Sequence, residues 1–266
     1  MSTLHSFAGK TVFVAGGTSG INLGVAHAFA AAGARLAVLS RKQDKVAAAV
    51  AALKAHGGEV LGHAADVRDP AAVEAALKDA AARLHGIDVL VSGAAGNFPA
   101  PALGISPNGF KSVMDIDVLG SFHVLRAAFP LLNKPGACII NISAPQAYVP
   151  MEFQMHVCAA KAGVDMITRV AAMEWGSAGV RVNSVSPGPI EGTEGMVRLA
   201  PTAAAQQGVK NSVPLGRYGS TDDIAQACLW LASPAAGYVT GVVLPVDGGW
   251  SLSGLSAASA AIRKQA

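Results

Sequence analysis

Charged residues are scarce in this chain of 266 residues. They make up 14% of it, and 20 Lys and Arg nearly balance 17 Asp and Glu, which leaves a formal net charge of +3. A surface that binds nucleic acid normally carries a strong excess of basic residues, so we expect no nucleic-acid partner. Hydrophobic residues make up 52%, which predicts a large apolar area buried in a core, between subunits or around an apolar ligand.

Cysteine is also scarce, and long hydrophobic runs are missing. The three cysteines, Cys138, Cys158 and Cys228, lie far apart and have no spacing typical of a metal site. Together with their odd number, this predicts buried thiols in a reducing compartment, with neither a disulfide framework nor a bound metal. Charged residues interrupt the apolar stretches well before the roughly 20 residues that a membrane-spanning helix needs, so we expect no membrane partner.

Short β-branched runs alternate with longer alanine-rich stretches of helical period. The runs that predict strands are residues 11–15, 35–40, 60–64, 89–92, 137–142, 181–185 and 242–245. Strands separated by helices are typical of parallel βαβ units, so we predict an α/β fold. No linker interrupts the pattern, and residues 1–266 are therefore predicted to form a single domain. Within it we expect residues 193–212 to be an irregular substrate lid and residues 251–266 a C-terminal tail.

Two predicted helices carry recognisable start signals. Asp69 stands before Pro70 and predicts a capped helix that ends at Gly86. Ser220 and Asp223 predict the polar start of a later helix. Side chains of these types accept the free backbone N–H groups of a first helical turn, so the boundaries rest on hydrogen bonding as well as on periodicity.

A glycine-rich segment, residues 16–24, follows the first predicted strand and leads into a helix that we expect to begin near Leu23. Glycines allow the backbone to approach a pyrophosphate, whose charge the helix N-terminus stabilises. The predicted cofactor contacts in this segment are Gly16, Thr18, Ser19, Gly20 and Ile21. The alternative is a tight turn that serves only the fold.

The second predicted strand ends at Ser40 and is followed by Arg41 and Lys42. A site for NAD would carry a carboxylate there for the ribose hydroxyls, whereas an arginine can pair with the 2′-phosphate of NADP. The two cations therefore favour NADP as the cofactor, although a solvated basic helix start would give the same pattern. Asp66 and Val67, at the end of the third strand, are candidates to contact the adenine, with helix capping as the alternative for Asp66.

These features, together with residues 92–96, the helix of Lys161 and the pair Pro187-Gly188, resemble the short-chain dehydrogenase/reductase family over residues 7–250. The resemblance implies a Rossmann-type, doubly wound sheet of seven parallel strands, a homotetramer, and a cofactor at the carboxyl ends of the strands. It adds to the cofactor site Ala94, Lys161, Pro187, Gly188, Ile190 and Thr193. Asn22 stands where the family has a glycine, and we expect the turn to survive because asparagine tolerates unusual backbone angles.

The chain departs from this family at the catalytic positions. The tyrosine that belongs four residues before the lysine is Val157, the serine is Ala144, and the asparagine is Asp117, so that only Lys161 remains. Because valine has no proton to give, the usual reduction of a ketone with tyrosine as the acid is excluded. In enoyl-acyl-carrier reductases the tyrosine lies seven residues before the lysine, and that position holds Gln154.

Further segments resemble the 2,4-dienoyl-CoA reductases, above all the peroxisomal type, which also lacks the tyrosine and has an aspartate at the asparagine position. These segments are residues 96–98, residues 114–117, His156 and residues 188–195. The resemblance implies NADPH-dependent reduction of a 2,4-dienoyl-CoA thioester to a 3-enoyl-CoA in auxiliary fatty-acid β-oxidation, with an acyl-CoA as the bound substrate. In that reaction negative charge moves to the thioester oxygen, which needs hydrogen-bond donors rather than a strong acid.

The same resemblance assigns roles to single residues. Asp117 would hold a water that relays a proton, and Lys161 would bind the nicotinamide ribose. The substrate-binding candidates are Asn97, Phe98, Tyr148, His156 and Arg198. For Asp117 the alternative is a structural bond to the backbone, and for the substrate candidates it is packing or solvation.

Two other functions remain open. One is a reductase of the same family that acts on another enoyl or carbonyl substrate and recruits Tyr148 as the acid. The other is a catalytically silent nucleotide-binding subunit, which the altered catalytic positions would suit. The chain ends in Lys264-Gln265-Ala266 rather than Ser-Lys-Leu, so the expected location is the cytoplasm.

Overall fold

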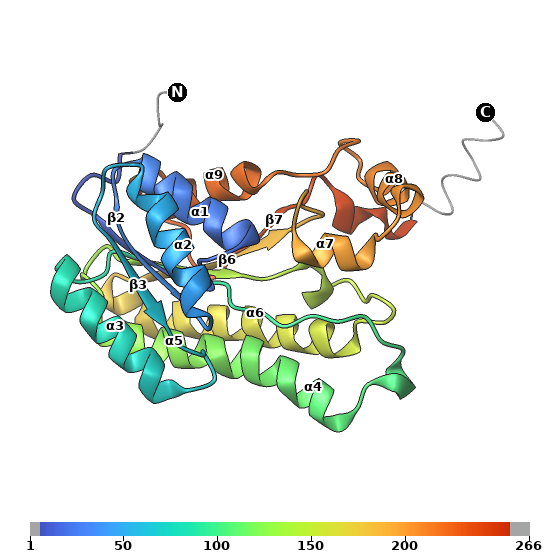
Figure 1. Ribbon diagram of the computed structural model, residues 1–266, viewed down its shortest axis with the longest axis horizontal. Helices are drawn as coiled ribbons and strands as arrows, with labels where there is room; N and C mark the ends of the chain where they lie inside the picture. The colour runs from blue at the N-terminus through green and yellow to red at the C-terminus, as the bar shows by residue number, and fades with distance from the viewer. Residues whose placement is uncertain (1–5, 256–266) are drawn as a thin grey trace.

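A seven-stranded parallel sheet forms the centre of the structure (Figure 1). The computed structural model describes residues 6–255. The strands are β1 (Thr11–Ala15), β2 (Arg35–Ser40), β3 (Val60–Ala64), β4 (Val89–Ser92), β5 (Cys138–Ile142), β6 (Arg181–Pro187) and β7 (Val243–Val246). Their order is β3-β2-β1-β4-β5-β6-β7, so the winding direction reverses between β1 and β4. The predicted doubly wound fold is confirmed, and this reversal places a crevice at the carboxyl ends of β1 and β4.

Helices cover both faces of the sheet (Figure 1). On one face lie α1 (Gly20–Ala31), α2 (Gln43–Lys54) and α9 (Thr221–Ala232), and on the other α3 (Pro70–Leu84), α5 (Gly120–Ala128) and α6 (Met155–Trp175). A π-helical turn, Asp115–Leu119, joins α4 (Pro107–Met114) to α5. The helices α7 (Glu194–Leu199) and α8 (Ala203–Ser212) lie together at one end of the molecule.

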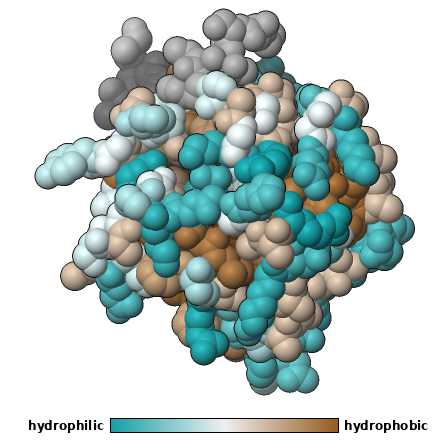
Figure 2. Space-filling view, turned by 90° about the vertical axis from the view of Figure 1, so that its left-hand side faces the viewer, coloured by the Kyte–Doolittle hydropathy of each residue, from teal (hydrophilic) through white to brown (hydrophobic). Residues whose placement is uncertain are grey.

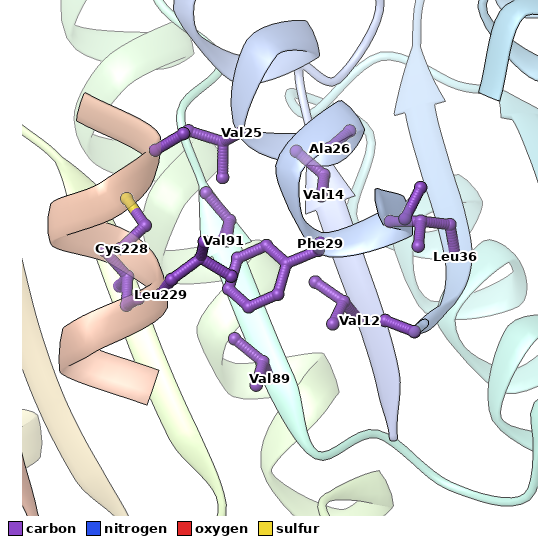
Figure 3. Close-up of a cluster of buried hydrophobic side chains, with 14 of the residues drawn as sticks. Val12, Val14, Val25, Ala26, Phe29, Leu36, Val89, Val91, Cys228 and Leu229 are labelled. Carbon is purple, nitrogen blue, oxygen red and sulfur yellow. The ribbon is translucent and has the colours of Figure 1, made fainter. Parts of the chain in front are cut away.

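The core beneath α1 and α9 is built around Phe29 (Figure 3). This side chain of α1 is fully buried and lies against Val12 and Val89 of the sheet. The two helices can approach each other closely because Gly24 has no side chain: a Cβ there would lie 2.5 Å from Cβ of Thr221. Packing on both faces explains why the strands are nearly continuous apolar runs rather than alternating ones.

The predicted helix starts at Asp69 and Ser220 agree with the structure, whereas two other predicted boundaries differ from it. The Asp69 carboxylate accepts two backbone N–H groups in the first turn of α3, and Ser220 and Asp223 form a reciprocal capping box at the start of α9. The helix α3 stops before the expected Gly86, because His85 already takes the left-handed conformation with φ 65°. The helix α1 begins at Gly20 rather than near Leu23.

The expectation that residues 193–212 are irregular is wrong, because the segment forms α7 and α8. A threonine begins each helix: Thr193 Oγ1 accepts from the backbone N–H of Met196, and Thr202 Oγ1 accepts from that of Ala205. These caps stabilise helices of six and ten residues. Such short helices do not show the long apolar period by which helices are found in a sequence.

The expectation of buried thiols is met at two of the three cysteines. Cys138 and Cys228 are buried, whereas Cys158 is only partly buried. Within residues 6–255, the helices lack the length and apolar character that a membrane crossing requires. The end of the molecule opposite α7 and α8 presents mostly hydrophilic side chains, with hydrophobic atoms in recesses between them (Figure 2). Of the predicted tail, residues 256–266 lie outside the described residues.

Candidate active site

A cleft of about 670 Å³ lies at the carboxyl ends of the strands and is bordered by α7. Its walls come from the glycine-rich turn after β1, the ends of β2, β3 and β4, Lys161 of α6, and the loop after β6. Every residue that the sequence analysis proposed for the cofactor lines this cleft, from Gly16 to Thr193. The topology therefore brings together segments that lie far apart in the sequence.

The glycine-rich turn is packed too tightly for side chains at two positions. A Cβ on Gly16, whose φ is 79°, would lie 2.9 Å from the backbone nitrogen of Ala94, and one on Gly17 would lie 2.9 Å from the carbonyl oxygen of Val14. The following helix, α1, begins after Ser19, whose side chain makes no capping bond. The N–H groups of its first turn, which no side chain caps, thus lie at the cleft, the arrangement that binds a phosphate anion.

Asn22 stabilises this turn for a different reason from the expected one. Its backbone is ordinary α-helix, so a tolerance for unusual angles is not what keeps the turn intact. Instead its Nδ2 donates to the carbonyl oxygens of Gly93, at 2.7 Å, and Gly16, at 3.4 Å. The side chain fills the space above Gly93, where a Cβ would lie 2.4 Å from Asn22 Oδ1. Asn22 thus ties the glycine turn to the end of β4.

Cations line the part of the cleft beyond β2. Arg41 and Lys42 both line it, and so does Lys45 of α2. The Asp66 carboxylate, nearby, is held by Arg68, which donates to it from Nε at 3.0 Å and from Nη2 at 2.6 Å. These bonds hold the pKa of Asp66 below its usual value. Asp66 therefore does not cap α3, a role that Asp69 takes.

Lys161 and Asp117 form a buried ion pair behind the cleft. Lys161 Nζ lies 3.2 Å from Asp117 Oδ2 and donates to the carbonyl oxygen of Ile142 at 3.1 Å. Asp117 Oδ1 accepts the backbone N–H of Gly96 at 2.7 Å. Asp117 is fully buried in the π-helical turn and does not line the cleft, whereas Lys161 does. Asp117 consequently reaches the cleft only through Lys161 and the loop after β4.

The positions that carry tyrosine and serine in the family pattern hold no acid here. Val157 is buried, and Ala144 lines the cleft with a methyl group. Tyr148, the candidate substitute acid, is outside the residues that line the cleft. Its hydroxyl lies 3.1 Å from Ser186 Oγ, to which it is hydrogen-bonded. The structure therefore places no tyrosine hydroxyl beside Lys161 among the described residues that line the cleft.

The structure brings only two of the five predicted substrate residues to the cleft. Asn97 and Arg198 line it, and Arg198 Nη1 donates to the backbone oxygen of Asn97 at 2.8 Å. Phe98, Tyr148 and His156 do not. The His156 ring is fully buried behind Phe98, with ring centroids 4.3 Å apart, and burial lowers the pKa of His156. His156 thus packs in the interior, which was the alternative interpretation.

Sequence reasoning gave no site role to Gln154, Lys45 and Glu194, which connect elements around the cleft. Gln154 Nε2 donates to Asn97 Oδ1 at 3.0 Å, and Lys45 Nζ lies 3.6 Å from Glu194 Oε1 of α7. No spacing in the sequence marks these pairs, because each joins segments far apart in the chain.

Within residues 6–255, no group of three His, Cys, Asp or Glu side chains is placed to hold a metal ion.

The switch-point cleft, its glycine turn at an uncapped helix N-terminus and its buried lysine together define a dinucleotide-binding protein of the Rossmann type. A family model described as enoyl-(acyl carrier protein) reductase matches residues 15–251. The chain belongs to the short-chain dehydrogenase/reductase family and is an oxidoreductase with a nicotinamide cofactor. The residues around the cleft fit a dinucleotide cofactor, because the glycine turn and the uncapped N-terminus of α1 expose backbone N–H groups where a pyrophosphate would lie.

Two curated relatives and one solved structure illustrate the similarity. The peroxisomal 2,4-dienoyl-CoA reductase of Rattus norvegicus, named as (3E)-enoyl-CoA-producing, is 43% identical over 242 residues, which cover 90% of this chain and 83% of the relative. The corresponding Saccharomyces cerevisiae protein is 41% identical over 251 residues, covering 92% and 86%. A short chain dehydrogenase from Bacillus anthracis superposes with a TM-score of 0.85 at 34% identity, covering 92% of this chain and 98% of that one.

The comparisons correct the expected location. The relatives from rat and yeast are both named peroxisomal, which contradicts the cytoplasmic expectation. That expectation relied on the last residues of the chain alone. These residues lie outside the described part of the structure, so the correction comes from the relatives.

Proposed function

We propose that this protein reduces 2,4-dienoyl-CoA thioesters to 3-enoyl-CoA with NADPH, as a step of auxiliary fatty-acid β-oxidation. The observation that carries the proposal is the buried pair of Lys161 and Asp117 behind the cleft, together with Val157 at the position of the tyrosine acid. Such a site suits a substrate whose negative charge moves onto a thioester oxygen. The relatives named as 2,4-dienoyl-CoA reductases support the same substrate class.

Arg41 and Lys42 support NADP as the form of the cofactor. Both line the cleft just after β2. An NAD site would have a carboxylate at this place, whereas here two cations occupy it. Arg41 would pair with the 2′-phosphate. Replacing Arg41 with alanine should therefore weaken NADPH binding roughly 10- to 100-fold and leave NADH binding nearly unchanged.

When bound, the nicotinamide supplies a hydride to the conjugated substrate. Lys161 carries three N–H donors; one is used by the carbonyl oxygen of Ile142, the Asp117 carboxylate lies 3.2 Å away as the counter-charge, and a further N–H would serve a ribose hydroxyl or a water in the cleft. Asp117 holds the ammonium group in place, a role that differs from the water-holding one first expected of it. Asn97, at the edge of the cleft, donates to the thioester oxygen as negative charge develops there.

The segment of residues 193–212 serves as the lid over the substrate. The residues of α7 that line the cleft include Met196 and Leu199, which offer apolar contact to an acyl chain. Arg198, on the same helix, would meet a CoA phosphate. Because it also holds the backbone of Asn97, the lid and the loop after β4 would close on the substrate together.

A homotetramer is supported by the exposed apolar side chains of the α5 and α6 layer. Leu119 and Phe122 are each 47% exposed, and on α6 Met166, Val170 and Met173 are 55%, 45% and 84% exposed. The three α6 residues fall on one helical face, and an exposed apolar stripe of this kind typically marks an interface. Light scattering should give a tetramer mass, and Met173→Glu should shift the mass towards a smaller species.

The central experiment follows NADPH oxidation with 2,4-dienoyl-CoA, 2-enoyl-CoA and 3-ketoacyl-CoA. We expect turnover of the dienoyl thioester and, for Tyr148→Phe, a rate within about threefold of wild type, because the Tyr148 hydroxyl lies outside the cleft lining. Loss of activity in Tyr148→Phe would instead favour a reductase that uses this tyrosine as its acid. NADPH binding without turnover of any thioester would favour a silent subunit.

A further inference from the structure

The start of α6 holds the loop that follows β4 at several points. Ala100 donates its backbone N–H to the carbonyl oxygen of Phe153 at 3.0 Å. The Phe98 ring packs on His156, and Gln154 Nε2 donates to Asn97 Oδ1 at 3.0 Å. The loop that carries Asn97 is therefore docked on residues 153–156.

Gln154 is placed for this contact by an unfavourable backbone conformation. Phe153 has a φ of 64°, in the left-handed region that side chains other than glycine rarely adopt. Its own side chain is 55% exposed, so burial of the ring does not compensate for the strain. The next residue, Gln154, is fully buried and turns its carboxamide towards the loop. Strain that persists without gain for the strained side chain points to a function of its neighbour.

The hydrogen bonds of Asn97 leave one polar group of its side chain for the cleft. Its backbone oxygen accepts from Arg198, and its Oδ1 accepts from Gln154. A carboxamide is planar, so a fixed Oδ1 also fixes the direction of Nδ2 and its two N–H donors. Asn97 lines the cleft. If the Asn97 amide were rotated by half a turn, its Oδ1 would face the cleft and would repel a substrate oxygen.

We propose that Gln154 is a positioning residue that holds the Asn97 carboxamide with Nδ2, and not Oδ1, available to the thioester oxygen of the substrate. The inference rests on the proposed function, because it takes a thioester as the ligand. Gln154 itself does not line the cleft. It acts through Asn97, by selecting which end of that amide faces the charge that develops during reduction.

Two replacements of Gln154 separate positioning from packing. Gln154→Met keeps the volume but removes the donor, so the Asn97 amide can rotate freely. Gln154→Glu offers only acceptors and should turn the amide so that Oδ1 faces the cleft. We expect kcat with 2,4-dienoyl-CoA to fall about 10-fold in the first variant and about 100-fold in the second. The dissociation constant of NADPH should change less than about twofold, since Gln154 lies outside the cofactor site.

A double variant shows whether Gln154 acts through Asn97. Asn97→Ala removes the donor itself, so adding Gln154→Met should lower kcat no further. Multiplied losses in the double variant would overturn the proposal. If neither Gln154 variant folds, Asn97→Asp tests the premise of the proposal, because it keeps the acceptor for Gln154 Nε2 but has no N–H for the substrate. Asn97→Asp with wild-type kcat would also overturn it.

Infrared spectroscopy tests the inference without any turnover. Hexanoyl-CoA with a ¹³C-labelled thioester carbonyl has no conjugated double bond and cannot be reduced, so it serves as an unreactive probe of the site. In the wild-type protein with NADP⁺, its carbonyl band should lie at lower frequency than in water, and Gln154→Met should lose most of that shift. An equal band position in both proteins would refute the role of Gln154. If the wild-type protein gives the shift but does not reduce dienoyl-CoA, the proposed function fails and the positioning role stands.

Discussion

Removing the charge of Asp117 should destabilise the protein strongly, and removing the charge of Lys161 as well should restore most of the loss. The two groups lie 3.2 Å apart, with the lysine side chain 8% exposed and the aspartate side chain fully buried. At this distance and an effective dielectric constant of 20, their attraction is about 5 kcal/mol. Much of it offsets the desolvation of both ions, so a lone buried charge is the costly state.

Asp117→Asn keeps the acceptor for the N–H of Gly96 but turns an amide N–H₂ towards the Lys161 ammonium. We expect the free energy of unfolding to fall by about 3 to 5 kcal/mol, and by a similar amount for Lys161→Met, which strands the carboxylate. The double variant leaves no buried charge at this place. Its free energy of unfolding should lie within about 2 kcal/mol of the wild-type value, a loss far smaller than the sum of the two single losses.

Urea unfolding, followed by circular dichroism at pH 7 and at one protein concentration, measures these differences in the free energy of unfolding. The variants can be compared if the unfolding free energy falls with urea concentration at the same slope in each. The kinetic expectation is separate: both single variants and the double variant should lose reduction of the dienoyl thioester, because each disturbs the Lys161 ammonium. Additive stability losses in the double variant would refute the reasoning, since they would mean that the two charges do not compensate each other.

Three further predictions concern stability. Ser220→Ala removes half of the capping box with Asp223 and should lower the free energy of unfolding by about 1 kcal/mol in urea unfolding. Phe29→Ala empties the centre of the core and should cost about 3 to 5 kcal/mol by the same method; a loss below 1 kcal/mol would contradict the packing in Figure 3. Burial and the neighbouring His56, whose Nε2 lies 3.0 Å from His27 Nδ1, lower the pKa of His27. The stability that neutral His27 contributes is therefore present above the pKa of the unfolded chain and is lost as the pH falls through the lower pKa of the folded protein. Between pH 7.5 and pH 5, the melting temperature of the wild type should consequently drop more than that of His27→Gln.

Much of the cleft lining could be predicted from the sequence because its determinants are local. The glycine turn, the cations after β2 and the residues after β6 each sit at the end of a predicted strand, and parallel strands bring such ends to one edge. The predicted contacts from Gly16 to Thr193 all line one cleft. Asn22 was predicted to be tolerated for its backbone, but its side chain bonds to Gly93 across the sheet, a contact that no local pattern contains.

The substrate side could be predicted less well because its contacts cross between elements. Phe98 and His156 are both predicted substrate residues, yet neither lines the cleft, because the His156 ring is buried and the partly buried Phe98 ring packs on it. Asp117 was expected to hold water in the cleft, but the π-helical turn buries it behind Lys161. Which way a side chain points depends on helix register and packing, and residue spacing alone does not determine either.

The amino-acid sequence by itself determined the order of strands and helices, the parallel doubly wound sheet and many of the segments that line its cleft, because hydrophobic period, glycine and capping residues act over a few neighbouring positions. Only the tertiary structure decided that Asp117 pairs with Lys161, that Gln154 holds Asn97 and that residues 193–212 form two helices beside the cleft. The physical reason is that a buried charge or amide is stable only with a partner, and the chain supplies that partner from a segment whose distance in sequence carries no signal.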